Sequence, residues 1–280
     1  MARGALLLIL EGRGESSPFV TEGNAMTAVY PELSGRVVAV TGAAQGIGAC
    51  TARAFAEQGA KVAALDIDEA GAADVVREIA AQGGKAIAVS VDVTDEKSVQ
   101  GAIGRTVDEL GGLDVLVTSA GGYGRLAQVE DMPVEEWDKT VALNLRGTFL
   151  CCKTAIPHLK KSPAGRIVTI SSISGRTISS STSPAYAAAK AGVIQLTRFL
   201  AYTLGSHGIT CNSVAPITTL TPRVKALRTP ENIAQISAQV PMKRLPDPDE
   251  HARVVVFLAS DGASYLNGMV MDTNGGKVMM

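Results

Sequence analysis

Short apolar runs alternate along the chain with longer stretches in which apolar residues recur every three or four positions. A short apolar run is typical of a buried strand, and the longer period is typical of a helix with one buried face. Strands are predicted at residues 36–41, 61–65, 85–91, 113–118, 166–170, 209–214 and 269–271. Helices are predicted at residues 46–58, 69–82, 95–110, 134–160, 185–205 and 247–259, the fourth of them interrupted near Pro157.

Strand and helix alternate from residue 34 to residue 280, and no change of composition marks a second domain. Right-handed crossovers between parallel strands place helices on both faces of a sheet. The alternation therefore predicts a single doubly wound α/β domain. Ligands of such sheets bind beyond the carboxyl ends of the strands, so the chemistry is expected in the turns that follow them.

Residues 1–33 are predicted to be a poorly ordered leader. The apolar run at residues 5–10 is only six residues long and is followed by Glu11 and Arg13. A signal peptide needs roughly 7–15 apolar residues, and a membrane span needs about 20. We therefore expect neither, and no other stretch approaches membrane length.

Composition narrows the function further. The chain has 26 Lys and Arg against 27 Asp and Glu, a net charge of −1, which argues against a broad attraction to nucleic acid or to an anionic membrane. Four cysteines are present without the spacing of a zinc site, so no metal is expected, and they indicate a reducing, cytoplasmic compartment. These cysteines are Cys50, Cys151, Cys152 and Cys211.

The turn after the first strand, residues 41–48, has the spacing Gly-x3-Gly-x-Gly. Its glycines allow a sharp turn, a close approach of a pyrophosphate and close packing of the following helix, whose N-terminus attracts phosphate. Glycines in a turn are common, so the motif alone also fits a structural turn. The residues expected to contact a dinucleotide here are Gly42, Gln45, Gly46, Ile47 and Gly48.

Asp66 ends the second predicted strand, where a carboxylate can accept hydrogen bonds from both ribose hydroxyls of a dinucleotide. A 2′-phosphate would meet like charge at this point, and no Arg or Lys occupies residues 43–49 or 67–68. The sequence thus favours NAD(H) over NADP(H) as cofactor. The alternative is an ordinary acidic residue at a strand end.

Tyr186 and Lys190 stand four positions apart in a predicted helix and therefore share one face. A Tyr with an ordinary pKa of about 10 is protonated at neutral pH. A neighbouring ammonium and an oxidised nicotinamide would stabilise the phenolate and lower that pKa, which suits general acid–base work. The spacing also occurs in helices that have no catalytic role.

Taken together, these motifs resemble the short-chain dehydrogenase/reductase family over about residues 34–276. The features that carry the resemblance occur in the family's order: residues 41–48, Asp66, Asp92, Asn144, Ser172 and the pair Tyr186 and Lys190. The resemblance implies a Rossmann-like fold with a seven-stranded parallel sheet, hydride transfer to or from a nicotinamide, and a homotetramer.

The resemblance also implies residue roles. Ser172 would hydrogen-bond the substrate oxygen, with Ser171 as its competitor, and Tyr186 would transfer the proton. Lys190 would hold the nicotinamide ribose and lower the pKa of Tyr186, and Asn144 would seat a water in a proton relay. Further cofactor contacts are implied for Asp92, Val93, Ala120, Gly121, Pro216 and Thr221.

Two turns depart from the family's pattern. The family's Asn-Asn-Ala-Gly appears as Thr-Ser-Ala-Gly at residues 118–121, which replaces amide side chains by hydroxyls. The family's Pro-Gly appears as Pro216 and Ile217, and isoleucine cannot cheaply adopt glycine's left-handed conformations. We expect the loop near the nicotinamide to differ accordingly.

Residues 217–245 are expected to form a lid over the substrate, next to a Ser- and Thr-rich segment at residues 176–183. The mixture indicates a neutral, moderately apolar secondary alcohol or ketone, with the lid arginines in solvent. The leading hypothesis is an NAD-dependent alcohol dehydrogenase or ketone reductase. The alternatives are a 3-oxoacyl thioester reductase and a non-catalytic dinucleotide-binding regulator.

Overall fold

The computed structural model of the protein describes residues 28–178 and 182–279. Its strands form one sheet with the order β3-β2-β1-β4-β5-β6-β7, and every neighbouring pair is parallel. The strands are β1 (Val37–Thr41), β2 (Lys61–Asp66), β3 (Lys85–Ser90), β4 (Val115–Thr118), β5 (Arg166–Ile170), β6 (Thr210–Pro216) and β7 (Val270–Thr273).

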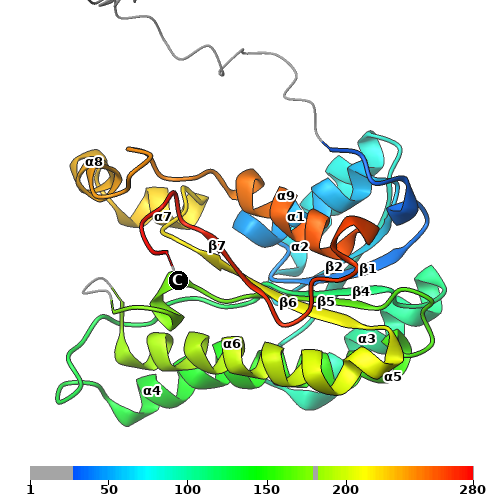
Figure 1. Ribbon diagram of the computed structural model, residues 1–280, viewed down its shortest axis with the longest axis horizontal. Coiled ribbons are helices and arrows are strands. Elements are labelled where there is room, and N and C mark those ends of the chain that lie inside the picture. The colour runs from blue at the N-terminus through cyan, green and yellow to red at the C-terminus, as the bar shows by residue number, and fades with distance from the viewer. Residues whose placement is uncertain (1–27, 179–181, 280) are drawn as a thin grey trace, which may run out of the picture.

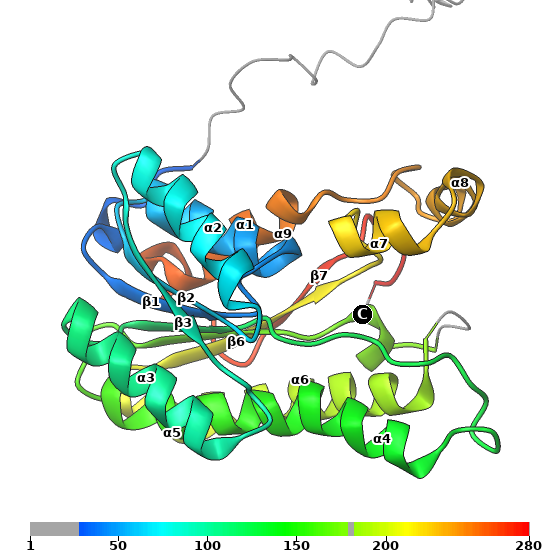
Figure 2. The ribbon, with the colours of Figure 1, turned by 180° about the vertical axis from the view of Figure 1, so that it is seen from behind.

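Helices cover both faces of this sheet (Figures 1 and 2), as the alternation of elements predicts. On one side lie α1 (Gly46–Glu57), α2 (Glu69–Ala81) and α9 (Pro248–Ala259). On the other lie α3 (Glu96–Leu110), α4 (Val134–Val141), α5 (Gly147–Leu159) and α6 (Pro184–Leu204). The short helices α7 (Pro222–Leu227) and α8 (Pro230–Ala238) lie beyond the end of β6.

The apolar periodicity has its physical origin in two cores, one on each face of the sheet. Val38, Val40 and Phe55 are fully buried in the core under α1 and α9. Leu116 and Ile167 are fully buried in the core under α3, α5 and α6. The strands read as continuous apolar runs because their side chains alternate between these two cores.

The long predicted helix at residues 134–160 is interrupted, but not at Pro157. Pro157 lies in the last turn of α5, two residues before that helix ends. The interruption is a π-helical segment, Ala142–Arg146, between α4 and α5. Pro157 costs α5 one backbone hydrogen bond close to its end, where little helix remains to be redirected, whereas a π turn adds a residue to the helix and redirects its side chains.

The packed domain begins slightly before the predicted boundary at residue 34. Pro31–Leu33 form a 3-10 turn, and the Leu33 side chain is buried. The Glu32 carboxylate accepts a hydrogen bond of 2.9 Å from the backbone N–H of Asp261. Residues 1–27 of the expected leader lie outside the described part of the chain.

No helix within residues 28–178 and 182–279 is long and apolar enough to cross a membrane. No cluster of three or more His, Cys, Asp or Glu side chains in those ranges is arranged to hold a metal ion. The four cysteines are free thiols, and Cys50 alone among them is partly exposed.

Candidate active site

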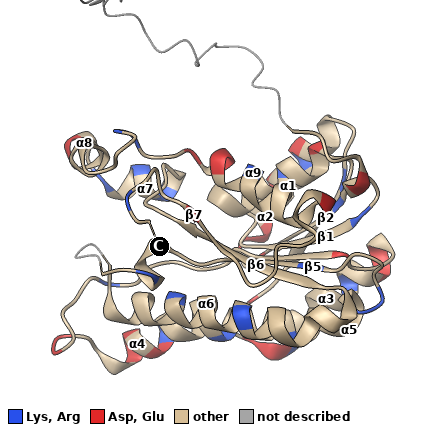
Figure 3. Cartoon of the chain, viewed as in Figure 1, with Lys and Arg blue, Asp and Glu red and all other residues tan. Residues whose placement is uncertain are grey.

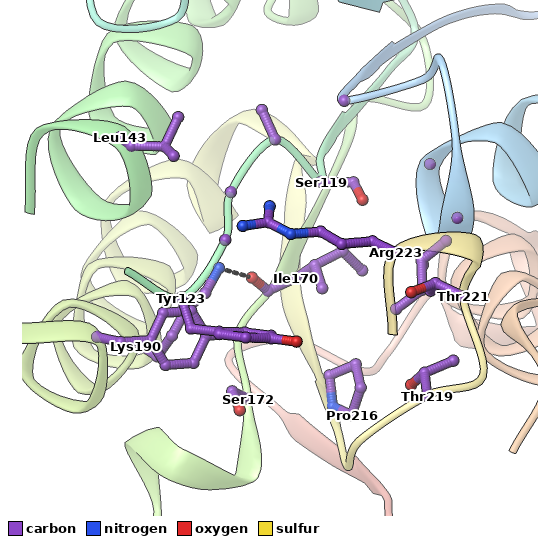
Figure 4. Close-up of a pocket in the computed structure, with 18 of the residues that line it drawn as sticks. Ser119, Tyr123, Leu143, Ile170, Ser172, Lys190, Pro216, Thr219, Thr221 and Arg223 are labelled. Carbon is purple, nitrogen blue, oxygen red and sulfur yellow. Dashed lines mark hydrogen bonds between the residues drawn. The ribbon is translucent and has the colours of Figure 1, made fainter. Parts of the chain in front are cut away.

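A cavity of about 420 Å³ opens at the carboxyl ends of the strands (Figure 4). It joins the glycine turn after β1 to the first turns of α6 and to α7. Nearly all of the residues expected from the sequence line it: Gly42, Gln45, Gly46, Ile47, Gly48, Asp66, Asp92, Val93, Ala120, Gly121, Ser172, Tyr186, Lys190, Pro216 and Thr221. Asn144 lies behind the wall instead.

The turn between β1 and α1 is built of close backbone contacts. Gly42 and Gly46 have φ of 68° and 58°, a conformation that glycine adopts without strain. A Cβ on Gly42 would lie 2.7 Å from the Cα of Ala120, and a Cβ on Gly48 would overlap the carbonyl oxygen of Gly42. The turn therefore presents bare backbone to the cavity at the N-terminus of α1, as a pyrophosphate site requires.

Asp66, the last residue of β2, lies beside this turn. Its carboxylate accepts a hydrogen bond of 2.9 Å from the N–H of Ala44 and one of 3.0 Å from the N–H of Asp68. These bonds hold the carboxylate at the edge of the cavity beside Ile67. Asp92 is held similarly, because it accepts 2.8 Å and 2.7 Å hydrogen bonds from the N–H and hydroxyl of Thr94.

Tyr186 and Lys190 occupy successive turns at the start of α6. The helix begins after Ser183, whose hydroxyl accepts a hydrogen bond of 3.2 Å from the N–H of Tyr186. The Lys190 ammonium donates a hydrogen bond of 2.8 Å to the carbonyl oxygen of Ile170, at the end of β5. It lies 5.6 Å from the centre of the Tyr186 ring, so the i,i+4 spacing brings both groups to one wall.

Burial governs the charge states of this pair. Burial raises the pKa of Tyr186 to about 12, against smaller lowering effects from a Ser172 hydrogen bond and the charge of Arg223. Burial lowers the pKa of Lys190 to about 8, because its ammonium is removed from water. In the protein alone the Tyr186 hydroxyl is thus protonated at neutral pH.

The hydroxyls of the two serines after β5 have different hydrogen-bond partners. The Ser171 hydroxyl donates a hydrogen bond of 2.9 Å to the carbonyl oxygen of Val214 and accepts one of 2.8 Å from Ser213. Ser172 begins the following 3-10 turn, where its hydroxyl accepts a hydrogen bond of 3.1 Å from Ser174 N–H. The Ser172 proton remains available toward Tyr186 and the cavity.

Asn144 lies in the π-helical segment and is fully buried. Its side-chain amide donates hydrogen bonds of 2.9 Å to the carbonyl oxygens of Gly122 and Thr140. Its side-chain oxygen accepts one of 3.1 Å from the N–H of Gly122. These contacts fix the loop after β4, next to the cavity rather than in it.

The two turns that depart from the family's pattern are accommodated differently. The Thr118 hydroxyl is buried without a hydrogen-bond partner among the described residues. The turn after β4 is held instead by Thr41, whose hydroxyl accepts hydrogen bonds of 3.1 Å from the N–H groups of Ser119 and Ala120. Ile217 is buried with a negative φ, since Lys243 is the one non-glycine residue with positive φ within residues 28–178 and 182–279.

Several residues near the site were given no specific role by the sequence analysis. Tyr123 packs edge to face against Tyr186, with ring centres 6.2 Å apart, and Arg223 reaches across the cavity to Tyr123. The buried His251 ring joins the hydroxyls of Thr219 and Thr273 through two contacts of 2.8 Å. No local motif marks these residues, and the one sequence signal available is the position of Tyr123 in the Gly-rich stretch at residues 121–125.

The cavity fits a dinucleotide by its own chemistry. Bare glycine backbone at the N-terminus of α1 suits a pyrophosphate, and Asp66 suits ribose hydroxyls. Thr221 covers Gly46 on the far side, with its methyl group 3.1 Å from where a Cβ of Gly46 would stand. Residues 179–181 of the expected Ser- and Thr-rich segment lie outside the described residues.

Comparisons with known proteins agree with this geometry. The family model described as "Enoyl-(Acyl carrier protein) reductase" matches residues 42–277. The cis-4-hydroxycyclohexanecarboxylate dehydrogenase of Sinomonas cyclohexanicum is 43% identical over 86% of this chain and 96% of its own length. The 3-oxoacyl-[acyl-carrier-protein] reductase of Vibrio cholerae is 39% identical over 89% of this chain and 99% of its own.

Among solved structures, a short-chain type dehydrogenase/reductase from Mycobacterium marinum superposes with a TM-score of 0.84 at 34% identity. The match covers 89% of this chain and 97% of the other. Sequence, fold and cavity thus agree, and the chain belongs to the short-chain dehydrogenase/reductase family of oxidoreductases.

Proposed function

We propose that the protein transfers a hydride between NAD(H) and a secondary alcohol or ketone. The observation that carries this proposal is the meeting of Tyr186, Ser172 and Lys190 in one cavity, whose other end is formed by the glycine turn and Asp66. The bound nicotinamide supplies the hydride acceptor for oxidation and the donor for reduction. Relatives that are named dehydrogenases of alcohols support the same reaction class.

The residues of this chain divide the remaining work. Ser172 donates its hydroxyl proton to the substrate oxygen, and Tyr186 removes or supplies the proton on that oxygen. Lys190, held by the Ile170 carbonyl, keeps a positive charge beside Tyr186 and binds the ribose of the nicotinamide. Asn144 fixes the loop after β4 and, through its second side-chain lone pair, seats the water of a proton relay.

NAD(H) is proposed as cofactor because of the charges around Asp66. The acidic residues that line the described cavity are Asp66 and Asp92, and its basic residues lie on α6, on α7 and directly after α7. A 2′-phosphate beside Asp66 would meet a carboxylate without a compensating cation. The remaining contacts are proposed for Val93, Ala120, Gly121, Pro216 and Thr221.

The proposed substrate class is a cyclic secondary alcohol, under a lid formed by residues 217–245. The Sinomonas relative is named for a hydroxylated cyclohexane ring, and a Sphingobium indicum relative for a cyclohexadiene diol. Leu220, Ile233 and Ile236 pack around the buried Ile217 and so give the lid an apolar interior. A ring substrate suits such a surface.

A 3-oxoacyl thioester reductase is the second candidate, favoured by the 39% identity to the Vibrio enzyme. It would require tight NADPH binding, which Asp66 opposes. A dinucleotide-binding regulator without turnover is the third candidate. The complete set of Ser172, Tyr186 and Lys190 argues against that reading, since a regulator has no use for a buried proton donor and cation.

Two further properties belong to the proposal. We propose a homotetramer, because Phe149 on α5 and both Phe199 and Tyr202 on α6 expose large apolar side chains. We also propose a cytoplasmic location, which suits the free thiols of the described residues.

The test is NADH formation by the purified protein with a panel of cyclic secondary alcohols. Tyr186→Phe should reduce kcat by roughly 1,000-fold or more and leave NADH binding within about twofold, because proton transfer is lost and the cavity is kept. A titration with NADPH tests the cofactor. Tighter binding of NADPH than of NADH would overturn the NAD assignment.

A further inference from the structure

Arg223 crosses the active-site cavity from α7 to the loop after β4 (Figure 4). Its guanidinium carbon lies 5.5 Å from the centre of the Tyr123 ring, in a cation–π arrangement. Tyr123 in turn packs edge to face against Tyr186. One aromatic ring therefore separates the guanidinium from the proposed proton donor.

The backbone opposite Arg223 leaves room for the guanidinium. A Cβ on Gly122 would stand 2.8 Å from a terminal nitrogen of Arg223, so the guanidinium could keep this position only beside a residue without a side chain. Gly122 is itself fixed by its paired hydrogen bonds with Asn144. The guanidinium thus lies against this loop at the edge of the cavity, while the Arg223 residue as a whole remains exposed to solvent.

The charge of Arg223 is not neutralised by the described protein. No ion pair or hydrogen bond joins its side chain to another residue within 28–178 and 182–279. Arg228, the neighbouring basic residue, donates 2.8 Å to the uncharged Asn232 side chain. Figure 3 marks the basic residues along α7. The catalytic half of the cavity therefore carries an excess of positive charge.

We propose that Arg223 binds a carboxylate of the substrate, so that the protein acts on hydroxy acids and oxo acids whose carboxylate stands apart from the reacting carbon. The inference rests on the proposed function, because it names the substrate class of that same site. A guanidinium presents two parallel N–H donors that match the two oxygens of a carboxylate. It replaces the expectation that the substrate is neutral, and an exposed Arg223 remains accessible to an entering carboxylate.

The pyrophosphate of the cofactor is the other anion that could reach this region. Its site is the N-terminus of α1, where Thr221 covers Gly46. The Arg223 guanidinium lies instead against Gly122 and Tyr123, on the β4 side and toward Tyr186. The position of the guanidinium thus favours the substrate over the pyrophosphate.

The experiment compares two probes of equal shape, 4-hydroxycyclohexanecarboxylate and its primary amide, in steady-state oxidation with NAD⁺. The wild-type kcat/KM should favour the carboxylate by roughly 10- to 100-fold, as expected for a charge-assisted bidentate contact. Arg223→Gln should bring this ratio close to one, and Arg223→Lys should retain part of it. An effect of the substitution on the reacting groups would change kcat/KM for both probes equally and would therefore leave the ratio unchanged.

Lys97→Gln is the control, because Lys97 is an exposed cation on α3 that lies outside both the cavity and the proposed lid. It should leave the ratio and the activity unchanged. A second readout needs no turnover: cyclohexanecarboxylate and cyclohexanecarboxamide are titrated into the NADH complex of each variant by fluorescence. Preferential binding of the acid that is lost in Arg223→Gln supports the proposal even for a protein without activity.

Three results would overturn it. Turnover of the amide with a ratio of one or less in the wild type leaves the proposed function intact but removes the carboxylate site. An unchanged ratio in Arg223→Gln removes Arg223 from the site. Weaker NADH binding in that variant, with both probes affected equally, assigns Arg223 to the pyrophosphate. Failure of every alcohol to form NADH is a separate result that sinks the proposed function, while the binding titration still decides this inference.

Discussion

Asn144 and Gly122 are joined by a reciprocal pair of hydrogen bonds, in which the side-chain amide of Asn144 acts like a backbone peptide group. The donated bond is 2.9 Å long, and the accepted bond is 3.1 Å long. The π-helical segment directs this side chain at the loop after β4. Because the same loop carries Tyr123 and faces Arg223, one buried amide positions much of the proposed substrate wall.

Asn144→Asp should lower the free energy of unfolding by about 3–5 kcal/mol, because a carboxylate would face the carbonyl oxygens of Gly122 and Thr140 without a donor. Denaturant unfolding measures this change. Asn232→Asp on α8 is the control, since its partner is the Arg228 guanidinium, and it should stay within about 0.5 kcal/mol of the wild type. Equal stability of the two variants would show that the Asn144 contacts are dispensable.

Gly48→Ala should abolish saturable NADH binding and destabilise the protein, because the new Cβ would overlap the carbonyl oxygen of Gly42. The backbone cannot yield there without opening the turn between β1 and α1. The control is Gly101→Ala, in α3, where a Cβ would meet open space. That change should stabilise the protein by about 0.5–1 kcal/mol, since alanine is the better helix former. Normal NADH affinity in Gly48→Ala would contradict the proposed cofactor site.

His251 should make the protein less stable in mild acid. Burial lowers its pKa from 6.5 to about 4, partly offset by the negative charge of Glu250. Between these values the unfolded chain binds a proton that the folded protein refuses, so stability falls as pH drops from about 6.5 to 4. The loss amounts to about 3 kcal/mol at the lower end.

The melting temperature as a function of pH measures this effect. His251→Gln should be less stable than the wild type at pH 7 and less sensitive to acid below it, because the titrating ring is gone. His207→Gln, which changes an exposed histidine, should follow the wild-type curve. If His251→Gln is as sensitive to acid as the wild type, another group is responsible.

The rate of alcohol oxidation should rise with pH, and the rate of ketone reduction should fall. In the proposed mechanism oxidation needs the Tyr186 phenolate, and burial raises the pKa of Tyr186 to about 12 in the protein alone. An oxidised nicotinamide adds positive charge beside the ring and moves this pKa down, into the range where activity is measured.

A substitution of Arg223 tests whether nearby charge sets the pKa of Tyr186. Its charge lowers the pKa of Tyr186, so Arg223→Gln should shift the rising limb of the oxidation profile to higher pH. The measurement is kcat/KM from about pH 6 to 10 for a neutral alcohol with both proteins. A profile that is flat in this range would exclude Tyr186 as the titrating base.

The apolar pattern alone was enough to place the strands and the helices on both faces of the sheet. Buried strands must be apolar on both sides, and helices must bury one stripe, so the periodicity follows from the layered fold itself. The pattern was wrong about the break near Pro157, since the break lies at Ala142–Arg146. A π-helical turn depends on what the turn packs against, and the local sequence carries no mark of it.

The site residues likewise fall into those that the sequence indicated and those that only the folded structure brought together. Gly42, Tyr186 and Lys190 stood out in the sequence because their chemistry depends on short spacings within one turn or one helix, and Asp66 stood out because it ends a predicted strand. The family pattern already favoured Ser172 over Ser171, and the structure adds that the Ser171 hydroxyl is tied to β6. The role proposed for Arg223 depended on the folded structure. Contacts across the cavity join residues about 100 positions apart, and only the packing of the folded chain determines which side chains meet there.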